Sequence, residues 1–171
     1  METSRVSIVR SDMYRVGDKI VHPQHGAGVV KDIEEDVIQG FGCYYVIQLT
    51  AYNRTLMVPV DKADQIGVRE ISRPDIMVQV LETLSGAPDT LPGNYTQRQN
   101  RLGERLKSGD VLEVAEVVRD LAWRGHHKHL TSQDNGFLEQ ARRFLAGELA
   151  LCRGIEFDQA MTLLNGVMMA E

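Results

Sequence analysis

The sequence predicts an α+β protein in which a small Tudor/SH3-like β-barrel precedes a compact bundle of about five helices. Two observations support this prediction. From residue 14 to about residue 69, short runs rich in Val, Ile and Tyr alternate with turns containing Gly, Asn and Asp, as they do in small barrels. After Ser72 the apolar residues recur at helical spacing, in segments separated by Gly and Pro.

The composition is that of an ordinary globular protein. The chain has 171 residues, of which 43% are hydrophobic and 25% are charged. No apolar run is long enough for a membrane span or a signal peptide, so we expect a cytoplasmic protein without a membrane partner. The net charge of −5 argues against bulk electrostatic binding to nucleic acid. Residues 1–13 show no usable period, and we expect them to form a flexible extension.

We predict five short strands in the first domain, and four of them are recognisable as β-forming runs. These four runs are Lys19 to Val21, Gly28 to Ile33, Cys43 to Leu49 and Thr55 to Val60. Tyr45, Ile47 and Leu49 alternate with more polar residues, as expected for a sheet with one buried face. The runs 37–43 and 52–57 are predicted to flank an exposed edge, which either accepts a partner strand or is blunted by Gln39, Asn53 and Arg54 and has no partner.

Helix signals dominate the rest of the chain. Ser72 is expected to cap a helix with Pro74 at its first position, and residues 72–93 form that helix and a linker. Asn94 with Gln97, and Thr131 with Asp134, are typical of helix starts. Gly86, Gly109 and Gly154 are expected to end helices, and a last amphipathic helix runs from Phe157 to Met168.

No motif indicates catalysis. The five histidines, His22, His25, His126, His127 and His129, lack Cys or carboxylate partners at ligand spacing, so we predict no metal and no cofactor. A β run, not a helix, follows the glycines of residues 25–28, which argues against a phosphate loop. Cys43 and Cys152 are expected to be buried thiols. We therefore predict that the chain is not an enzyme.

The most basic segment is the helix that starts near Tyr95. Arg98, Arg101 and Arg105 are spaced to share one face, and Tyr95 stands at the helix start. Two interpretations remain open. The helix N-terminus and the aromatic ring contact DNA, or the ring is a structural staple beside a solvated arginine stripe.

Two motifs resemble the CarD/CdnL family of bacterial transcription regulators. They are VGDKIVHPQHGAGVV at Val16 to Val30 and SGDVLEVAEVVRDL at Ser108 to Leu121, and the resemblance covers most of Tyr14 to Met168. It implies that residues 14–71 form a Tudor-like domain that binds the β subunit of RNA polymerase. It also implies that residues 94–171 form a helical domain at the upstream fork of the promoter bubble, so that the protein stabilises the open complex.

The same resemblance suggests site residues. Relatives carry Asn-Trp where this chain has Asn94 and Tyr95, and the implied DNA contacts are Asn94, Tyr95, Gln97, Arg98 and Arg101. Positions that are basic in relatives are neutral here, so we expect weak, minor-groove DNA binding that depends on polymerase. Trp123 matches a bundle position of the family, so we expect it to be a packing residue. The implied polymerase-binding residues are Asp36, Val37, Ile38, Arg54, Leu56 and Met57.

Other functions remain to be distinguished. One alternative is that the chain is a protein-interaction adaptor, whose helical domain binds a protein in place of DNA. An isolated nucleic-acid-binding module would bind DNA without polymerase and in a salt-dependent way, which the acidic net charge disfavours. We expect a monomer that associates with the nucleoid through RNA polymerase.

Overall fold

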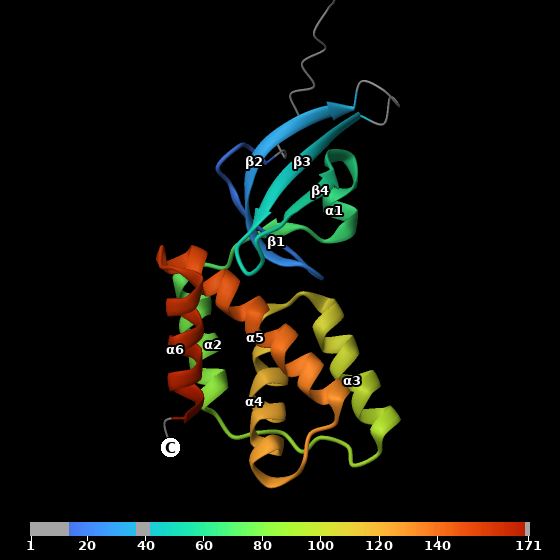
Figure 1. Cartoon of the computed structure of the whole chain (residues 1–171), viewed down its shortest axis with the longest axis vertical. Coiled ribbons are helices and arrows are strands. Elements are labelled where there is room, and N and C mark those ends of the chain that lie inside the picture. The colour runs from blue at the N-terminus through green and yellow to red at the C-terminus, as the bar shows by residue number, and fades with distance from the viewer. Residues whose placement is uncertain (1–13, 37–41, 170–171) are drawn as a thin grey trace, which may run out of the picture.

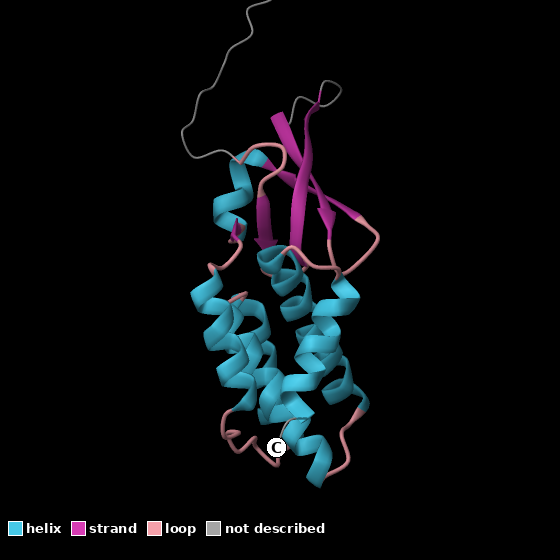
Figure 2. Ribbon diagram, turned by 90° about the vertical axis from the view of Figure 1, so that its left-hand side faces the viewer, coloured by secondary structure: helices cyan, strands magenta, loops and turns pink. Residues whose placement is uncertain are grey.

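The computed structural model describes residues 14–36 and 42–169. A β domain occupies one end of the molecule and a helical bundle the other, as Figures 1 and 2 show. The predicted α+β class, with a sheet domain before five helices, is confirmed. Within the described ranges, no helix has the length and apolar character needed to cross a membrane.

The β domain is a five-stranded antiparallel sheet with the strand order β4-β3-β2-β1-β5. The strands are β1 (Lys19–His22), β2 (Gly26–Asp36), β3 (Gly42–Leu49), β4 (Thr55–Pro59) and β5 (Arg69–Glu70). The four predicted runs are therefore strands. The expected alternation also holds, because Tyr45, Ile47 and Leu49 are buried while their neighbours in β3 are partly exposed.

The expected closed barrel is wrong, because the sheet is open and β4 and β5 are its two edges. The last strand has only two residues, which are paired with β1. Between the two edges the chain forms a 3-10 turn, η1 (Val60–Lys62), and a short helix, α1 (Ala63–Ile66). Ala63 and Val68 pack into the sheet core with Ile20 and Tyr45, so this segment covers the sheet instead of completing a strand ladder.

A glycine of the first motif is required by close packing between strands. A Cβ atom at Gly28 would lie 2.6 Å from the carbonyl oxygen of Gln48 and 2.7 Å from a side-chain carbon of Ile47. Gly28 pairs with Leu49 in the β2–β3 ladder, so any larger residue would push the two strands apart.

Five helices follow the sheet, as predicted. They are α2 (Pro74–Ser85), α3 (Tyr95–Ser108), α4 (Val111–His127), α5 (Ser132–Arg153) and α6 (Phe157–Met169). Two predicted helix starts are confirmed. The Asn94 side chain accepts a hydrogen bond from the Gln97 backbone N–H at 3.0 Å, and Thr131 and Asp134 form a reciprocal capping box.

Two smaller expectations need correction. Ser72 does not cap α2, because the N-cap residue is Arg73 and it makes no side-chain capping bond. The Ser72 backbone N–H instead donates to Glu148 of α5 at 2.7 Å. Cys43 and Cys152 are only partly buried, because Cys43 lies near the open end of β3 and Cys152 in the last turn of α5.

The two domains share a packed interface. Val21 and Ala27 of the sheet belong to the apolar core of the bundle, together with residues of α2, α4, α5 and α6. A Cβ atom at Gly109 would lie 2.7 Å from the Cβ atom of Pro23, so the turn of the first motif packs on the glycine of the second. The two sequence motifs are therefore in contact, and their contact fixes the bundle against the sheet.

Candidate functional site

The start of α3 is exposed at the end of the bundle farthest from the sheet (Figure 1). Tyr95 is the first residue of this helix, and its side chain is 52% exposed. Asn94 and Gln97 are exposed as well. The helix N-terminus therefore presents an aromatic ring beside two exposed polar side chains, one of which, Asn94, caps the helix, in a region where backbone N–H groups and the helix dipole favour an anion.

The prediction that Arg98 contacts DNA needs correction, because the Arg98 side chain is only 3% exposed. Its guanidinium donates to both carboxylate oxygens of Asp134, at 3.0 and 3.2 Å, and to the carbonyl oxygens of Pro92 and Gly93. Arg98 therefore joins the linker, α3 and α5. It positions the exposed start of α3 and does not reach the surface itself.

Asp134, the ion-pair partner of Arg98, has a carboxyl group whose contacts favour the charged form. Asp134 is fully buried, and burial alone would raise its pKa. The hydrogen bonds from Arg98 and from Thr131 outweigh that effect and lower the pKa of Asp134 below its ordinary value. Because the capping box and the ion pair share this carboxylate, one buried charge organises the starts of both α3 and α5.

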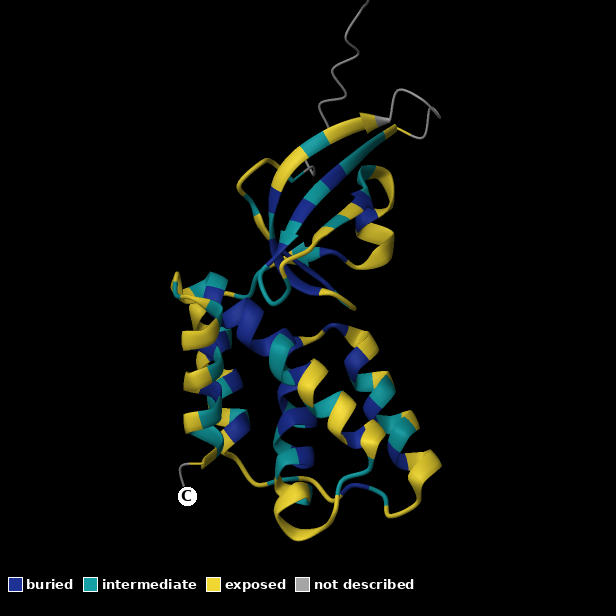
Figure 3. Ribbon diagram, in the orientation of Figure 1, coloured by how far each residue is buried: buried dark blue, intermediate teal, exposed yellow. Residues whose placement is uncertain are grey.

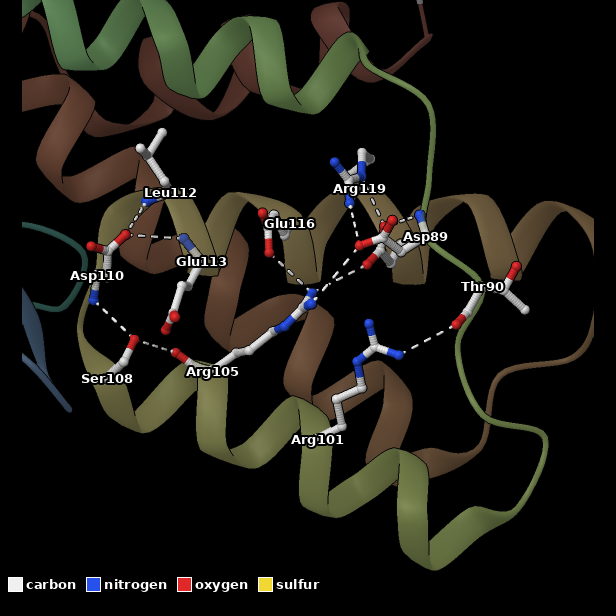
Figure 4. Close-up of polar contacts among 11 residues, drawn as sticks. Asp89, Thr90, Arg101, Arg105, Ser108, Asp110, Leu112, Glu113, Glu116 and Arg119 are labelled. Carbon is white, nitrogen blue, oxygen red and sulfur yellow. Dashed lines mark hydrogen bonds and ion pairs between the residues drawn. The ribbon is translucent and has the colours of Figure 1, made fainter.

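Arg105, which shares the predicted basic face, is also committed to internal contacts (Figure 4). Its guanidinium lies 3.2 Å from Glu116, 3.4 Å from Asp120 and 3.9 Å from Asp89. Arg101 differs, because its contact with the Thr90 carbonyl oxygen is long, at 3.5 Å, and it pairs with no carboxylate among the described residues. Of the three arginines, Arg101 remains available for a phosphate.

Side-chain amides dominate the surface beside α3. A cleft of about 610 Å³ lies between the β1–β2 turn, α3 and α5, and Gln24, Gln99, Asn100 and Gln140 line it. Asn100 and Gln140 are both exposed. This face therefore offers hydrogen bonds with little net charge.

Three of the predicted polymerase-binding residues, Arg54, Leu56 and Met57, lie in β4 or in the turn before it. Among the strands that the structure describes, β4 pairs only with β3, so its other side is an open edge of this sheet. Met57 is 50% exposed there, whereas Leu56 is partly buried against the sheet core. Arg54 is exposed in the β3–β4 turn, with its guanidinium 5.0 Å from the centre of the Tyr52 ring. The structure thus separates the outward-facing residues Arg54 and Met57 from Leu56.

Of the remaining predicted polymerase-binding positions, the structure describes only the backbone of Asp36. Asp36 is the last residue of β2 and pairs with Gly42. Val37, Ile38 and the side chain of Asp36 fall outside what the structure describes. Like Arg54, Leu56 and Met57, they remain predictions as polymerase contacts.

Sequence reasoning misplaced one residue that bears on function. Trp123 was expected to be packed, but its side chain is 45% exposed, and its ring stacks on His127 with ring centres 4.1 Å apart. Trp123 lies near the end of α4, where the helix passes beyond the core. Helical periodicity cannot detect this, because it does not show where the neighbouring helices end. Over the described ranges, the His, Cys, Asp and Glu side chains form no metal-binding cluster.

Comparison with known proteins agrees with this arrangement. Residues 14–72 match the CarD-like/TRCF RID domain family, and residues 79–165 match the family described as CarD, C-terminal domain. The chain is also 31% identical over 148 residues to "Putative transcription factor YdeB" of Bacillus subtilis (strain 168), covering 86% of this chain and 97% of that protein. These matches point to transcription regulation and not to an enzyme family. The chain belongs to the CarD/CdnL family of bacterial transcription regulators.

Proposed function

We propose that this regulator binds the β subunit of RNA polymerase through its sheet and stabilises the open promoter complex through its helical domain, at the upstream fork of the bubble. CarD-like/TRCF RID domains are known to bind RNA polymerase, and residues 14–72 match that family. Such a protein would work in the cytoplasm, on the nucleoid, as a monomer held there by the polymerase.

One observation carries this proposal. The open edge of β4 and the exposed start of α3 lie on different domains that are packed into one body. Figure 1 shows the start of α3 at the end of the bundle away from the sheet. A protein anchored at β4 would therefore hold Tyr95 at a set position on the DNA.

The polymerase contact is proposed at the β4 edge. An unpaired strand edge can add a partner strand through backbone hydrogen bonds, and outward side chains then select the partner. Met57 supplies an exposed apolar side chain on this edge, and Arg54 supplies a positive charge at its end.

The DNA contact is proposed at Tyr95. An aromatic ring at an exposed helix start can wedge against an unstacked base step in the minor groove, while the helix N-terminus and Arg101 contact phosphates. Few free cations support this contact, since Arg98 and Arg105 are paired internally. DNA affinity is therefore low for the free protein and is raised by tethering to polymerase, which increases the local concentration of the helical domain at the promoter.

Binding of the full chain to RNA polymerase and to its isolated β subunit tests the first half of the proposal. We expect the wild-type protein to bind both and Met57→Asp to weaken binding at least tenfold. Val78→Asp is the matched control, because Val78 is 49% exposed but lies on α2, in the other domain. If the wild-type chain does not bind the β subunit, the proposal fails.

The adaptor alternative differs in its prediction for Tyr95. If the helical domain bound only protein, Tyr95→Ala would leave the lifetime of the open complex unchanged while polymerase binding persisted. Our proposal expects a shorter lifetime.

A further inference from the structure

A groove lies between the C-terminal ends of α2, α4 and α6, away from the residues proposed to contact DNA. Its volume is about 520 Å³. Leu84 of α2, Trp123 of α4, and Val167 and Met168 of α6 supply its apolar walls, and His126 and His127 stand on the α4 side. A shallower hollow of about 320 Å³ continues beyond His126 toward Leu138.

Trp123 is the most informative residue of this groove. It is the single tryptophan of the chain, and it remains 45% exposed although it lines an apolar hollow. Tryptophan is among the residues that most often dominate binding energy when a partner covers them. The two methionines at the end of α6 add flexible, polarisable surface that adapts to different apolar partners.

The chain on the α4 side of the groove carries basic and no acidic residues. No acidic residue occurs between Asp120 and Asp134, and this stretch carries Arg124, Lys128 and three histidines. Figure 3 shows the connection from α4 to α5 as exposed. Neither Arg124 nor Lys128 forms an ion pair with any residue that the structure describes.

One further cation lines the groove, but it is already neutralised. Arg119 lies 2.8 Å from Asp120 and 3.4 Å from Asp89. The unpaired cations nearest to the groove in the sequence are Arg124, which follows Trp123 in α4, and Lys128, which follows His127, while the lining itself mixes apolar and polar side chains.

We propose that this groove docks an acidic amphipathic helix of a protein partner. The apolar stripe of such a helix would cover Trp123, Val167 and Met168, and its carboxylates would face Arg124 and Lys128. Duplex DNA fits less well, because Arg119, the one Lys or Arg in the described lining, is already paired with Asp89 and Asp120, and Leu84, Val167 and Met168 offer no donors to phosphates. The inference is independent of the contacts proposed for β4 and Tyr95.

The emission of Trp123 in the full-length protein reports directly on this groove, because no other tryptophan contributes. The probe is an 18-residue helical peptide with Leu at positions i, i+3, i+4 and i+7 of each repeat and Glu on the opposite face. We expect emission typical of an exposed indole without peptide, and a saturable shift to shorter wavelength as peptide is added. The same peptide with Lys in place of Glu, and a duplex oligonucleotide, should produce no saturable shift.

Two pairs of variants test the assignment. Met168→Glu should abolish the shift, whereas Leu163→Glu, a substitution of a 41% exposed residue on the same helix, should preserve it. Lys128→Glu should weaken peptide binding about threefold, as the loss of an exposed charge contact does, and Lys62→Glu in the sheet domain should have no effect. Lys128 is exposed, so this second pair remains informative if Met168→Glu unfolds the protein.

Three outcomes would overturn the proposal. The first is that the Glu peptide gives no saturable shift, or that the Lys peptide or DNA shifts the emission equally well. The second is that Trp123 already emits as a buried indole in the free chain. The third is that the emission depends on protein concentration in parallel with dimer formation, which would assign the groove to a second copy.

Discussion

Arg69 donates to both carboxylate oxygens of Glu148, at 2.8 and 3.0 Å, and this bidentate ion pair joins the last strand of the sheet to α5. Glu148 is fully buried, and it also accepts the Ser72 backbone N–H. Arg69 donates in addition to the carbonyl oxygen of Gly109, at the glycine that packs on Pro23. A single arginine therefore connects the sheet, α5 and the turn before α4.

Replacing Arg69 should destabilise the whole protein. Arg69→Met leaves the Glu148 carboxylate buried without its cation, and we expect the free energy of unfolding to fall by about 2–4 kcal/mol, since Arg69 is itself one-third exposed. Urea unfolding followed by circular dichroism measures this loss. Arg73→Met is the control, because the Arg73–Asp75 pair is exposed and its loss should cost less than about 1 kcal/mol. Equal effects of the two substitutions would contradict the role given to Arg69.

The β1–β2 turn should make stability depend on pH. The Nδ1 atom of His22 accepts the backbone N–H groups of Gln24 and His25 at 3.1 and 3.3 Å. Burial, and then the nearby His25, lower the pKa of His22 below its ordinary value. The unfolded chain therefore binds this proton more readily than the folded chain, and stability should decline as the pH falls below about 6.5.

Two substitutions of turn histidines test this dependence. His22→Asn keeps an acceptor for the same two N–H groups but cannot titrate, so its unfolding free energy should be flatter between about pH 6.5 and pH 5. His25→Asn should keep most of the decline, because the Nδ1 acceptor of His22 is retained. If the unfolding free energy of His22→Asn falls with pH as steeply as that of the wild type, the pH dependence belongs to another group.

The arginines of α3 should separate into a structural one and a DNA-binding one. Arg98→Lys cannot maintain the paired bonds to Asp134 together with those to Pro92 and Gly93, so we expect a loss of about 2–3 kcal/mol in unfolding free energy. Arg101→Ala should change stability by less than about 0.5 kcal/mol.

For promoter DNA binding we expect the reverse: Arg101→Ala has the larger direct effect on affinity, although it has the smaller effect on stability. In the presence of polymerase, Arg101→Ala should lower promoter affinity and reduce the slope of log affinity against log salt by about one. Measuring affinity at several salt concentrations checks this. An unchanged promoter affinity and salt slope for Arg101→Ala would show that Arg101 does not contact phosphate.

Adding a charge at Gln97 should strengthen DNA binding. Gln97 is exposed in the first turn of α3, one turn from Arg101. Gln97→Lys should therefore raise promoter affinity and steepen the salt slope by about one, without changing the affinity for the β subunit. Gln65→Lys, at an exposed position of α1 in the sheet domain, is the matched control and should leave DNA binding unchanged.

Local signals predicted most of the fold. The period-two run in β3 and the capping residues Asn94 and Thr131 depend on interactions within a few residues, so they could be identified directly from the sequence. Barrel closure could not be identified in this way, because closure depends on whether the chain after β4 returns as a strand. In this protein that part of the chain forms η1 and α1.

The site was less predictable because burial depends on partners distant in the sequence. Arg98 was expected on the surface with Arg101, but its partner Asp134 lies 36 residues away. Trp123 was expected in the core, but it lines a groove between the ends of α2, α4 and α6 and is 45% exposed. Conversely, the contact between Pro23 and Gly109 explains why the two recognisable motifs occur together, although neither one alone indicates it.

The lifetime of the open promoter complex tests the central claim most directly. It should be measured with RNA polymerase saturated by wild-type protein, Tyr95→Ala or Tyr95→Trp. We expect the wild type to prolong the lifetime, Tyr95→Ala to lose most of that effect while binding polymerase normally, and Tyr95→Trp to match or exceed the wild type because its ring covers more of a base. An unchanged lifetime with Tyr95→Ala, on polymerase that carries the bound protein, would contradict the account.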